Sequence, residues 1–118
     1  MRDLDEATQR FGLATTSGGC PTVGIAGLTL GGGEGRLMEK YGTACDNLLS
    51  AQVVTVDGRR LKASHDSNPD LFWAIRGGGG NFGVVTTLEY QLHPVGEVVS
   101  GGLPYPPGTY SRSSSKLR

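Results

Sequence analysis

The chain of 118 residues is long enough for one domain with a modest hydrophobic core. Its 11 basic and 11 acidic residues balance, which argues against nucleic acid or an anionic membrane as a partner. No apolar run reaches the ~18 residues of a membrane-spanning helix, and the polar start MRDLDEATQR lacks a signal-peptide core. Because two cysteines make no disulfide framework, we expect a cytoplasmic location.

The first third of the chain predicts short elements on either side of a glycine-rich stretch. The few apolar side chains of residues 1–12 have helical spacing, and Leu13–Thr16 predicts a short strand. Gly18–Gly35 follows, with glycine at nearly half of its positions. Arg36–Tyr41 is rich in helix formers, and Gly42 directly after it predicts the end of a helix.

The middle of the chain predicts a β-hairpin. Leu48–Val56 ends in four consecutive β-branched residues, which is typical of a strand. Asp57-Gly58 is a favoured pair for a tight hairpin turn, and Arg60–Ala63 predicts the returning strand.

A helix and further strands are predicted after this hairpin. Asn68 predicts an N-cap with Pro69 as the first helical residue, and the run Gly77–Gly80 predicts the helix end. Gly83–Leu92 alternates like a strand, and Val98–Leu103 predicts another. Because hairpin signals outnumber parallel crossovers, we predict an α+β fold with a mostly antiparallel sheet.

Gly18–Gly35 is the strongest candidate for a ligand site. Glycine lets a backbone approach a ligand closely, and this stretch carries almost no charge. Within it, Val23–Leu30 predicts either a short strand or a turn of helix. Cys20 is its one reactive side chain. It is either a small buried residue in a turn, which composition alone favours, or a nucleophilic thiol beside a ligand.

Two other features of the sequence argue against a dinucleotide-binding fold and against a metal site. Gly78, Gly80 and Gly83 match the G-x-G-x-x-G pattern of dinucleotide-binding folds. That fingerprint follows a strand and opens a helix, whereas here a predicted helix precedes it and a strand follows. His65 and His93 have no cysteine or histidine neighbours at metal-ligand spacing, so we predict no metal site.

Four segments together indicate a family. CPTVGIAGLTLGGGEG, KYGTACDNLLSAQVVTVDG, NPDLFWAIRGGGGNFGVVT and LHP resemble FAD-linked oxidases of the vanillyl-alcohol oxidase/p-cresol methylhydroxylase type, in particular the berberine-bridge-enzyme-like branch. The resemblance implies that residues 1–103 are the second half of a bipartite PCMH-type FAD-binding domain, with short helices flanking its sheet. Residues 104–118 are rich in proline and serine and predict a disordered tail.

The resemblance implies roles for residues around FAD. Cys20 matches a cysteine whose sulfur bonds carbon 6 of the flavin ring in members that also attach the ring through a histidine. Val23 matches a residue that gates oxygen. Further contacts to the cofactor are implied at Thr22, Gly24, Gly27, Gly32, Gly33, Gly35, Tyr41, Gly83 and Val85.

The chain also departs from the family. Leu28 stands where berberine-bridge enzymes proper have a histidine near the flavin. The arginine–glycine–histidine loop for the cofactor phosphates and the substrate domain with its catalytic base are not in the sequence, so no catalytic residue is predicted.

The implied function is the FAD-binding portion of an oxidoreductase that moves hydride from a substrate C–H bond to flavin N5, with reoxidation by O₂. Its partners are FAD and, in the full-length parent, a small-molecule substrate. We expect the isolated chain to be inactive. The alternative is a non-catalytic half-domain or degenerate fragment that acts only by pairing with a separate first half.

Overall fold

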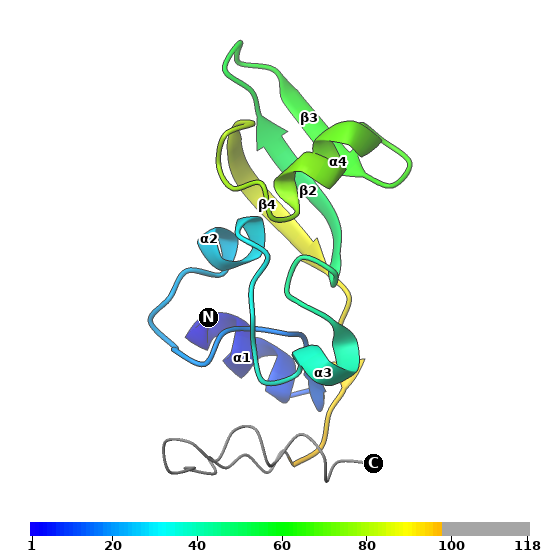
Figure 1. Ribbon diagram of the computed structural model, residues 1–118. Coiled ribbons are helices and arrows are strands. Elements are labelled where there is room, and N and C mark those ends of the chain that lie inside the picture. Colours follow the sequence, from blue (N-terminus) through cyan, green and yellow to red (C-terminus); the bar gives the residue numbers. More distant parts are fainter. Residues whose placement is uncertain (98–118) are drawn as a thin grey trace, which may run out of the picture.

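Three antiparallel strands form the larger sheet of the computed structural model, which describes residues 1–97 (Figure 1). β2 (Leu48–Val54) lies between β3 (Arg60–Ser64) and β4 (Val84–Tyr90). The predicted hairpin is confirmed, but its first strand ends at Val54 rather than Val56. The reason is that the N–H of Thr55 donates to the carbonyl of Arg59 and begins the turn there.

α4 (Pro69–Ile75) packs against this sheet and completes the main core. The core consists of buried strand residues together with two helix residues: Leu48, Ala51, Val53, Ala63, Phe72 and Ile75. The helix begins at Pro69, as predicted. Asn68 is the N-cap residue, as predicted, and its carbonyl accepts the hydrogen bond of the Phe72 N–H at 3.0 Å. Its side chain does not cap the helix, because its Nδ2 donates to the Lys62 carbonyl at 2.8 Å.

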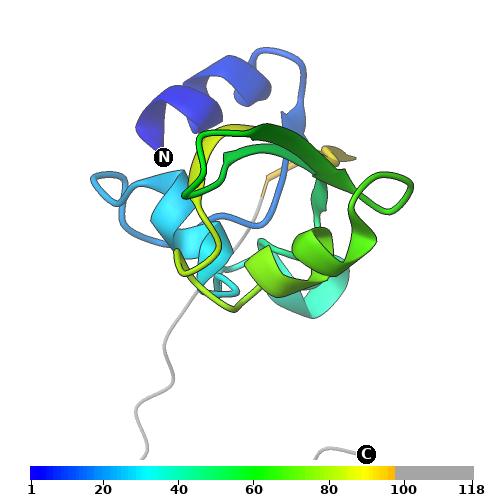
Figure 2. The ribbon, with the colours of Figure 1, turned by 90° about the horizontal axis from the view of Figure 1, so that it is seen from above.

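Two short helices lie between β1 and β2 in the chain. α2 (Ile25–Leu30) resolves the open alternative for residues 23–30 in favour of a helix. The N–H groups of Gly77 and Gly79 both donate to the Leu30 carbonyl and hold the end of α2. Figure 2 shows α2 and α4 on one side of the larger sheet. α3 (Met38–Tyr41) ends at Gly42, whose φ of 77° is left-handed, as predicted.

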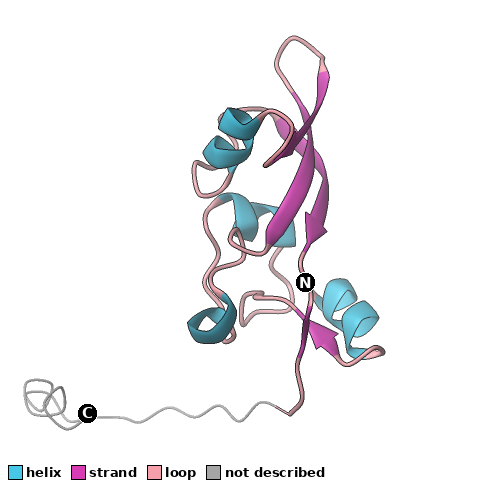
Figure 3. Cartoon of the chain, turned by 90° about the vertical axis from the view of Figure 1, so that its right-hand side faces the viewer, coloured by secondary structure: helices cyan, strands magenta, loops and turns pink. Residues whose placement is uncertain are grey.

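A second, smaller sheet lies at the end of the molecule opposite the β2–β3 hairpin (Figure 3). It consists of β1 (Leu13–Ala14) and β5 (His93–Pro94), which pair antiparallel. α1 (Arg2–Gln9) lies beside β1. The α+β class and the antiparallel sheets are thus confirmed.

Some predictions fall outside the described residues. These are the strand at 98–103, the tail at 104–118 and the domain boundary at residue 103. Within residues 1–97, no helix is long and apolar enough to cross a membrane.

Candidate functional site

Cys20 lies on an exposed loop between β1 and α2. Its Sγ atom is 3.2 Å from the Thr22 hydroxyl oxygen. Hydrogen bonds from Thr22, first through its side chain and then through its backbone, lower the pKa of the Cys20 thiol. The interpretation of Cys20 as a buried turn residue is therefore wrong. The exposed thiol is poised toward the thiolate, which is the nucleophilic form.

The start of α1 holds this loop in place. The N–H of Arg2 donates to the Pro21 carbonyl at 3.3 Å. The N–H of Gly18 donates to the Met1 sulfur at 3.0 Å. The position of the loop that carries Cys20 therefore depends on the position of α1.

The glycines predicted to contact a cofactor fall into two groups. A Cβ atom added at Gly24 or Gly27 would meet nothing within 4 Å, so the backbone there is open to a ligand. A Cβ at Gly33 would lie 2.6 Å from the Ala44 Cβ, and one at Gly35 would clash with the Ser17 carbonyl. These two glycines are required by the packing of the chain itself.

Gly32 is a third case. Its φ of 100° favours glycine, while the space beside it is open. Its carbonyl accepts a hydrogen bond from the Cys45 N–H at 2.9 Å. The backbone conformation at Gly32 therefore serves the turn between α2 and α3.

Tyr41, Gly83 and Val85 have roles in packing on elements other than the Cys20 loop. The Tyr41 ring stacks on His93 with 4.0 Å between ring centroids. Gly83 has a φ of 143°, and a Cβ there would lie 2.5 Å from the Val54 carbonyl oxygen. Val85 pairs with Val53 in the sheet and packs, half-buried, against the main core.

Leu28 is half-buried and packs inside the glycine-rich stretch. Its side chain would lie 3.5 Å from a Cβ added at Gly18 and 3.1 Å from a Cβ added at Gly33. Leu28 therefore holds the loop before Cys20 close to the turn after α2.

Asn47 is buried and makes hydrogen bonds to three parts of the chain. It is 3% exposed, and its Nδ2 donates to the carbonyls of Tyr41 and Thr43. Its Oδ1 accepts a hydrogen bond from His93 Nε2 at 2.6 Å. Asn47 thus joins α3, β2 and β5. The neighbouring Asp46 does serve the turn, because Thr43 donates two hydrogen bonds to it.

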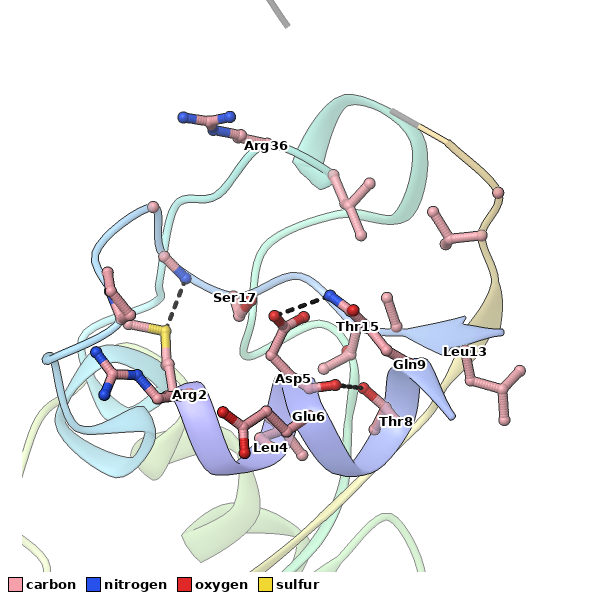
Figure 4. A pocket seen from close by; sticks show the side chains of 18 of the residues that line it. Arg2, Leu4, Asp5, Glu6, Thr8, Gln9, Leu13, Thr15, Ser17 and Arg36 are labelled. Atoms are coloured by element: carbon pink, nitrogen blue, oxygen red, sulfur yellow. Dashed lines mark hydrogen bonds between the residues drawn. The ribbon is translucent and has the colours of Figure 1, made fainter. Parts of the chain in front are cut away.

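A pocket of about 810 Å³ lies between α1, β1 and residues 95–97 (Figure 4). It shares Gly18, Gly19 and Pro21 with the Cys20 loop. Thr15 lines it, is 5% exposed, and has an Oγ1 without a hydrogen-bond partner. No sequence signal pointed to this pocket, because its walls come from opposite ends of the described chain.

Metal ligands are not gathered anywhere in residues 1–97. No group of three histidine, cysteine, aspartate or glutamate side chains there could hold an ion. His65 instead packs edge-on against Phe72, with 4.9 Å between ring centroids.

The comparisons with known proteins identify the fold and the cofactor. The model of a family described as FAD binding domain matches residues 1–64. The chain belongs to this FAD-binding domain family. The chain is 49% identical over 106 residues to the FAD-linked oxidoreductase pgmH of Aspergillus terreus. The match covers 90% of this chain and 22% of that relative.

Solved structures agree with this assignment. 6-Hydroxy-D-nicotine oxidase from Arthrobacter nicotinovorans matches with a TM-score of 0.76 and 51% identity, over 78% of this chain and 20% of that one. BBE-like 1 from Physcomitrella patens matches with a TM-score of 0.74 and 40% identity, over 77% and 20% of the two chains. The resemblance to the berberine-bridge-enzyme-like branch is confirmed. The chain spans about a fifth of the length of these relatives.

The residues present fit a flavin. FAD is the cofactor of this domain family. The open backbone at Gly24 and Gly27 leaves room for a flat ring, and the exposed Cys20 thiol lies on the loop that leads into α2. Thr22 and Val23, which lie between Cys20 and α2, are exposed as well, so the accessible part of the predicted set is one continuous loop with the start of α2.

Proposed function

We propose that this chain forms one wall of the flavin site of an FAD-linked oxidoreductase and that Cys20 attaches the cofactor. The observation that carries the proposal is the exposed Cys20 thiol, with its pKa lowered by Thr22, before the open glycines of α2. When bound, FAD supplies the hydride acceptor, N5, for a substrate C–H bond and returns the electrons to O₂.

Each accessible residue of the loop has a role in this proposal. Cys20 Sγ replaces the hydrogen on carbon 6 of the ring, with O₂ as the oxidant that takes up the two electrons. The Thr22 hydroxyl stabilises the thiolate before attachment. Val23, which is 42% exposed, controls the approach of O₂. Gly24 and Gly27 provide a backbone surface without side chains.

The test is covalent flavin on the polypeptide. The chain is produced with FAD, both alone and together with the segments of 6-hydroxy-D-nicotine oxidase that flank its matched region. We expect flavin that stays on the chain after denaturation, and its loss in Cys20→Ser. Cys45→Ser is the matched control, because Cys45 is half-buried and contacts the Thr43 hydroxyl. Equal covalent flavin in Cys20→Ser would show that the attachment site is elsewhere.

The second candidate function is a non-catalytic half-domain that acts only by pairing with a separate first half. The observation that favours it is the lack of a buried large apolar side chain in α1, β1 and β5, within the described residues. Association with the flanking segments without any bound flavin would favour this candidate over the first.

A further inference from the structure

A hydrogen-bonded pair of side chains joins α2 to the larger sheet. Thr29 is the only residue of α2 with a polar side chain, and it is fully buried. Its Oγ1 atom lies 2.7 Å from the hydroxyl oxygen of Tyr90, which stands on β4 and 61 positions later in the chain. Tyr90 is half-buried and packs against the main core. The pair therefore connects α2 with the best-packed part of the molecule.

The direction of this hydrogen bond follows from the other partner of Thr29. The Thr29 hydroxyl donates to the Ile25 carbonyl at 2.9 Å, which uses its single proton. The proton between the two hydroxyls therefore belongs to Tyr90, and Thr29 accepts it. Burial raises the pKa of the Tyr90 phenol, and the hydrogen bond with Thr29 lowers it by less. The phenol therefore stays protonated at neutral pH and remains a donor.

Two hydrogen bonds in series thus reach from β4 to the first turn of α2. Tyr90 donates to Thr29, and Thr29 donates to the carbonyl of Ile25, the first residue of the helix. Ile25 lies between Gly24 and Gly27, the two glycines with open space beside their backbone. The contact made by the Tyr90 hydroxyl is therefore passed on to the open backbone.

The other end of α2 is held in a different way. The N–H groups of Gly77 and Gly79 donate to the Leu30 carbonyl, so they act on the last residue of the helix and not on its first turn. A buried pair of hydroxyls keeps its partners at hydrogen-bond distance, because an unpaired buried hydroxyl is costly. Apolar side chains of the same shape would fill the space without fixing one arrangement. The hydroxyl pair is therefore suited to set the position of the first turn relative to β4.

We propose that Tyr90 is a positioning residue for the flavin site, because its hydroxyl, through Thr29, holds the open backbone at Gly24 and Gly27 in place for the cofactor. The inference rests on the proposed function, which takes this backbone to be part of a flavin site. Tyr90 acts only through Thr29 and α2.

Two amides report directly on the open glycines. The N–H of Leu28 donates to the Gly24 carbonyl, and the N–H of Gly31 donates to the Gly27 carbonyl, each at 3.3 Å. Hydrogen exchange at these two amides, measured in the full chain without cofactor, therefore shows how firmly α2 is held.

The test removes either hydroxyl of the pair and keeps the shape of the side chain. Tyr90→Phe and Thr29→Val are each expected to speed exchange at Leu28 and Gly31 by about three- to tenfold, with exchange in β2 unchanged. The double variant should show less than the product of the two single effects, since both substitutions break the same hydrogen bond.

Ser50→Ala is the matched control. Ser50 also has a buried hydroxyl on the larger sheet, but this hydroxyl donates to the Glu89 carboxylate at 2.6 Å and stays within the sheet. The control therefore removes a hydrogen bond between β2 and β4 without touching α2. We expect it to leave exchange at Leu28 and Gly31 unchanged.

A second measurement follows the flavin itself. The chain is combined with FAD and with the segments of 6-hydroxy-D-nicotine oxidase that flank its matched region. We expect Tyr90→Phe to slow covalent attachment at Cys20 by at least about threefold and to change the visible circular dichroism of the bound flavin. A merely structural role would lower thermal stability and leave this spectrum unchanged, as we expect for Ser50→Ala.

Several outcomes would overturn the proposal. One is exchange at Leu28 and Gly31 in Tyr90→Phe that equals that of the wild type. A second is faster exchange that is equal in α2 and β2, which indicates general destabilisation. A third is an effect of the double variant equal to the product of the single effects, which shows that the two hydroxyls act independently.

Flavin content, measured separately, distinguishes this inference from the proposed function. Selectively faster exchange in α2, together with a wild type that binds no flavin, supports the positioning of α2 by Tyr90 and contradicts flavin attachment. Covalent flavin that forms in Tyr90→Phe at the wild-type rate and with the wild-type spectrum supports attachment and overturns the positioning role.

Discussion

Gly33 and Gly27 lie six positions apart in the same glycine-rich stretch and serve different purposes. Gly33 has a φ of 83°, and a Cβ atom added there would lie 2.6 Å from the Ala44 Cβ. A side chain therefore has no room at this position. Gly27 lies in α2 with an ordinary helical backbone and open space beside it. The structure thus separates glycines that the fold needs from glycines that are free to face a ligand.

This separation predicts opposite effects of the same substitution. Gly33→Ala should lower the free energy of unfolding by about 2–4 kcal/mol, because it adds left-handed backbone strain and overpacking. Gly27→Ala should leave stability unchanged or raise it by up to about 1 kcal/mol, because alanine favours the helix. Urea unfolding measures both. Equal stability of the two variants would contradict the distinction.

The β2–β3 hairpin shows how an element is stabilised by its own turn. The Thr55 hydroxyl and the Arg59 guanidinium both donate to the Asp57 carboxylate. The Thr55 hydrogen bond, followed by that of Arg59, lowers the pKa of Asp57 from 3.8 to about 2. The folded state therefore favours the charged carboxylate. Asp57 stabilises the hairpin at pH values above the pKa that this carboxyl group has in the unfolded chain.

Acid titration tests this contribution. The stabilisation is present at pH values above the unfolded-state pKa of 3.8 and is lost as the pH falls through the folded-state pKa of about 2. Asp57→Asn should therefore show a smaller loss of thermal stability across this window than the wild type, and Thr55→Ala should change in the same direction. Added salt should shrink the difference, because the Arg59–Asp57 pair is exposed. An identical pH dependence in Asp57→Asn would contradict the assignment.

The molecule as a whole is unevenly stabilised. The larger sheet and α4 share a core in which Phe72 and Ile75 are almost fully buried. The end formed by α1, β1 and β5 relies on hydrogen bonds such as that from His93 to Asn47 and on the stacking of Tyr41 on His93. Regions with few buried apolar contacts unfold locally at a low cost in free energy.

Amide hydrogen exchange should follow this division. We expect the amides of Ala51 and Val53 in β2 to be protected at least about tenfold more strongly than those of α1 in the isolated chain. Addition of the flanking segments of the relative should raise the protection of α1 selectively. Equal protection of α1 and β2 in the isolated chain would show that the end formed by α1, β1 and β5 is stable without added segments.

The sequence by itself determined the features that depend on neighbouring residues. Asp57-Gly58 placed the hairpin turn, Pro69 the start of α4, and Gly42 the end of α3, because these residues restrict their own backbone. The resemblance of the four segments to FAD-linked oxidases also implied the cofactor, and the match to the FAD binding domain family confirms it.

Only the tertiary structure decided which side chains meet across long distances in the chain. Asn47 pairs with His93, 46 positions away, and the side chain of the N-cap residue Asn68 donates to the carbonyl of Lys62 rather than to its own helix. The division between open and packed glycines likewise depends on whether Ala44 or solvent lies beside them. The pocket beside the Cys20 loop joins residues 1–37 with residues 95–97. These features follow from how the elements pack, and packing depends on contacts that no local pattern contains.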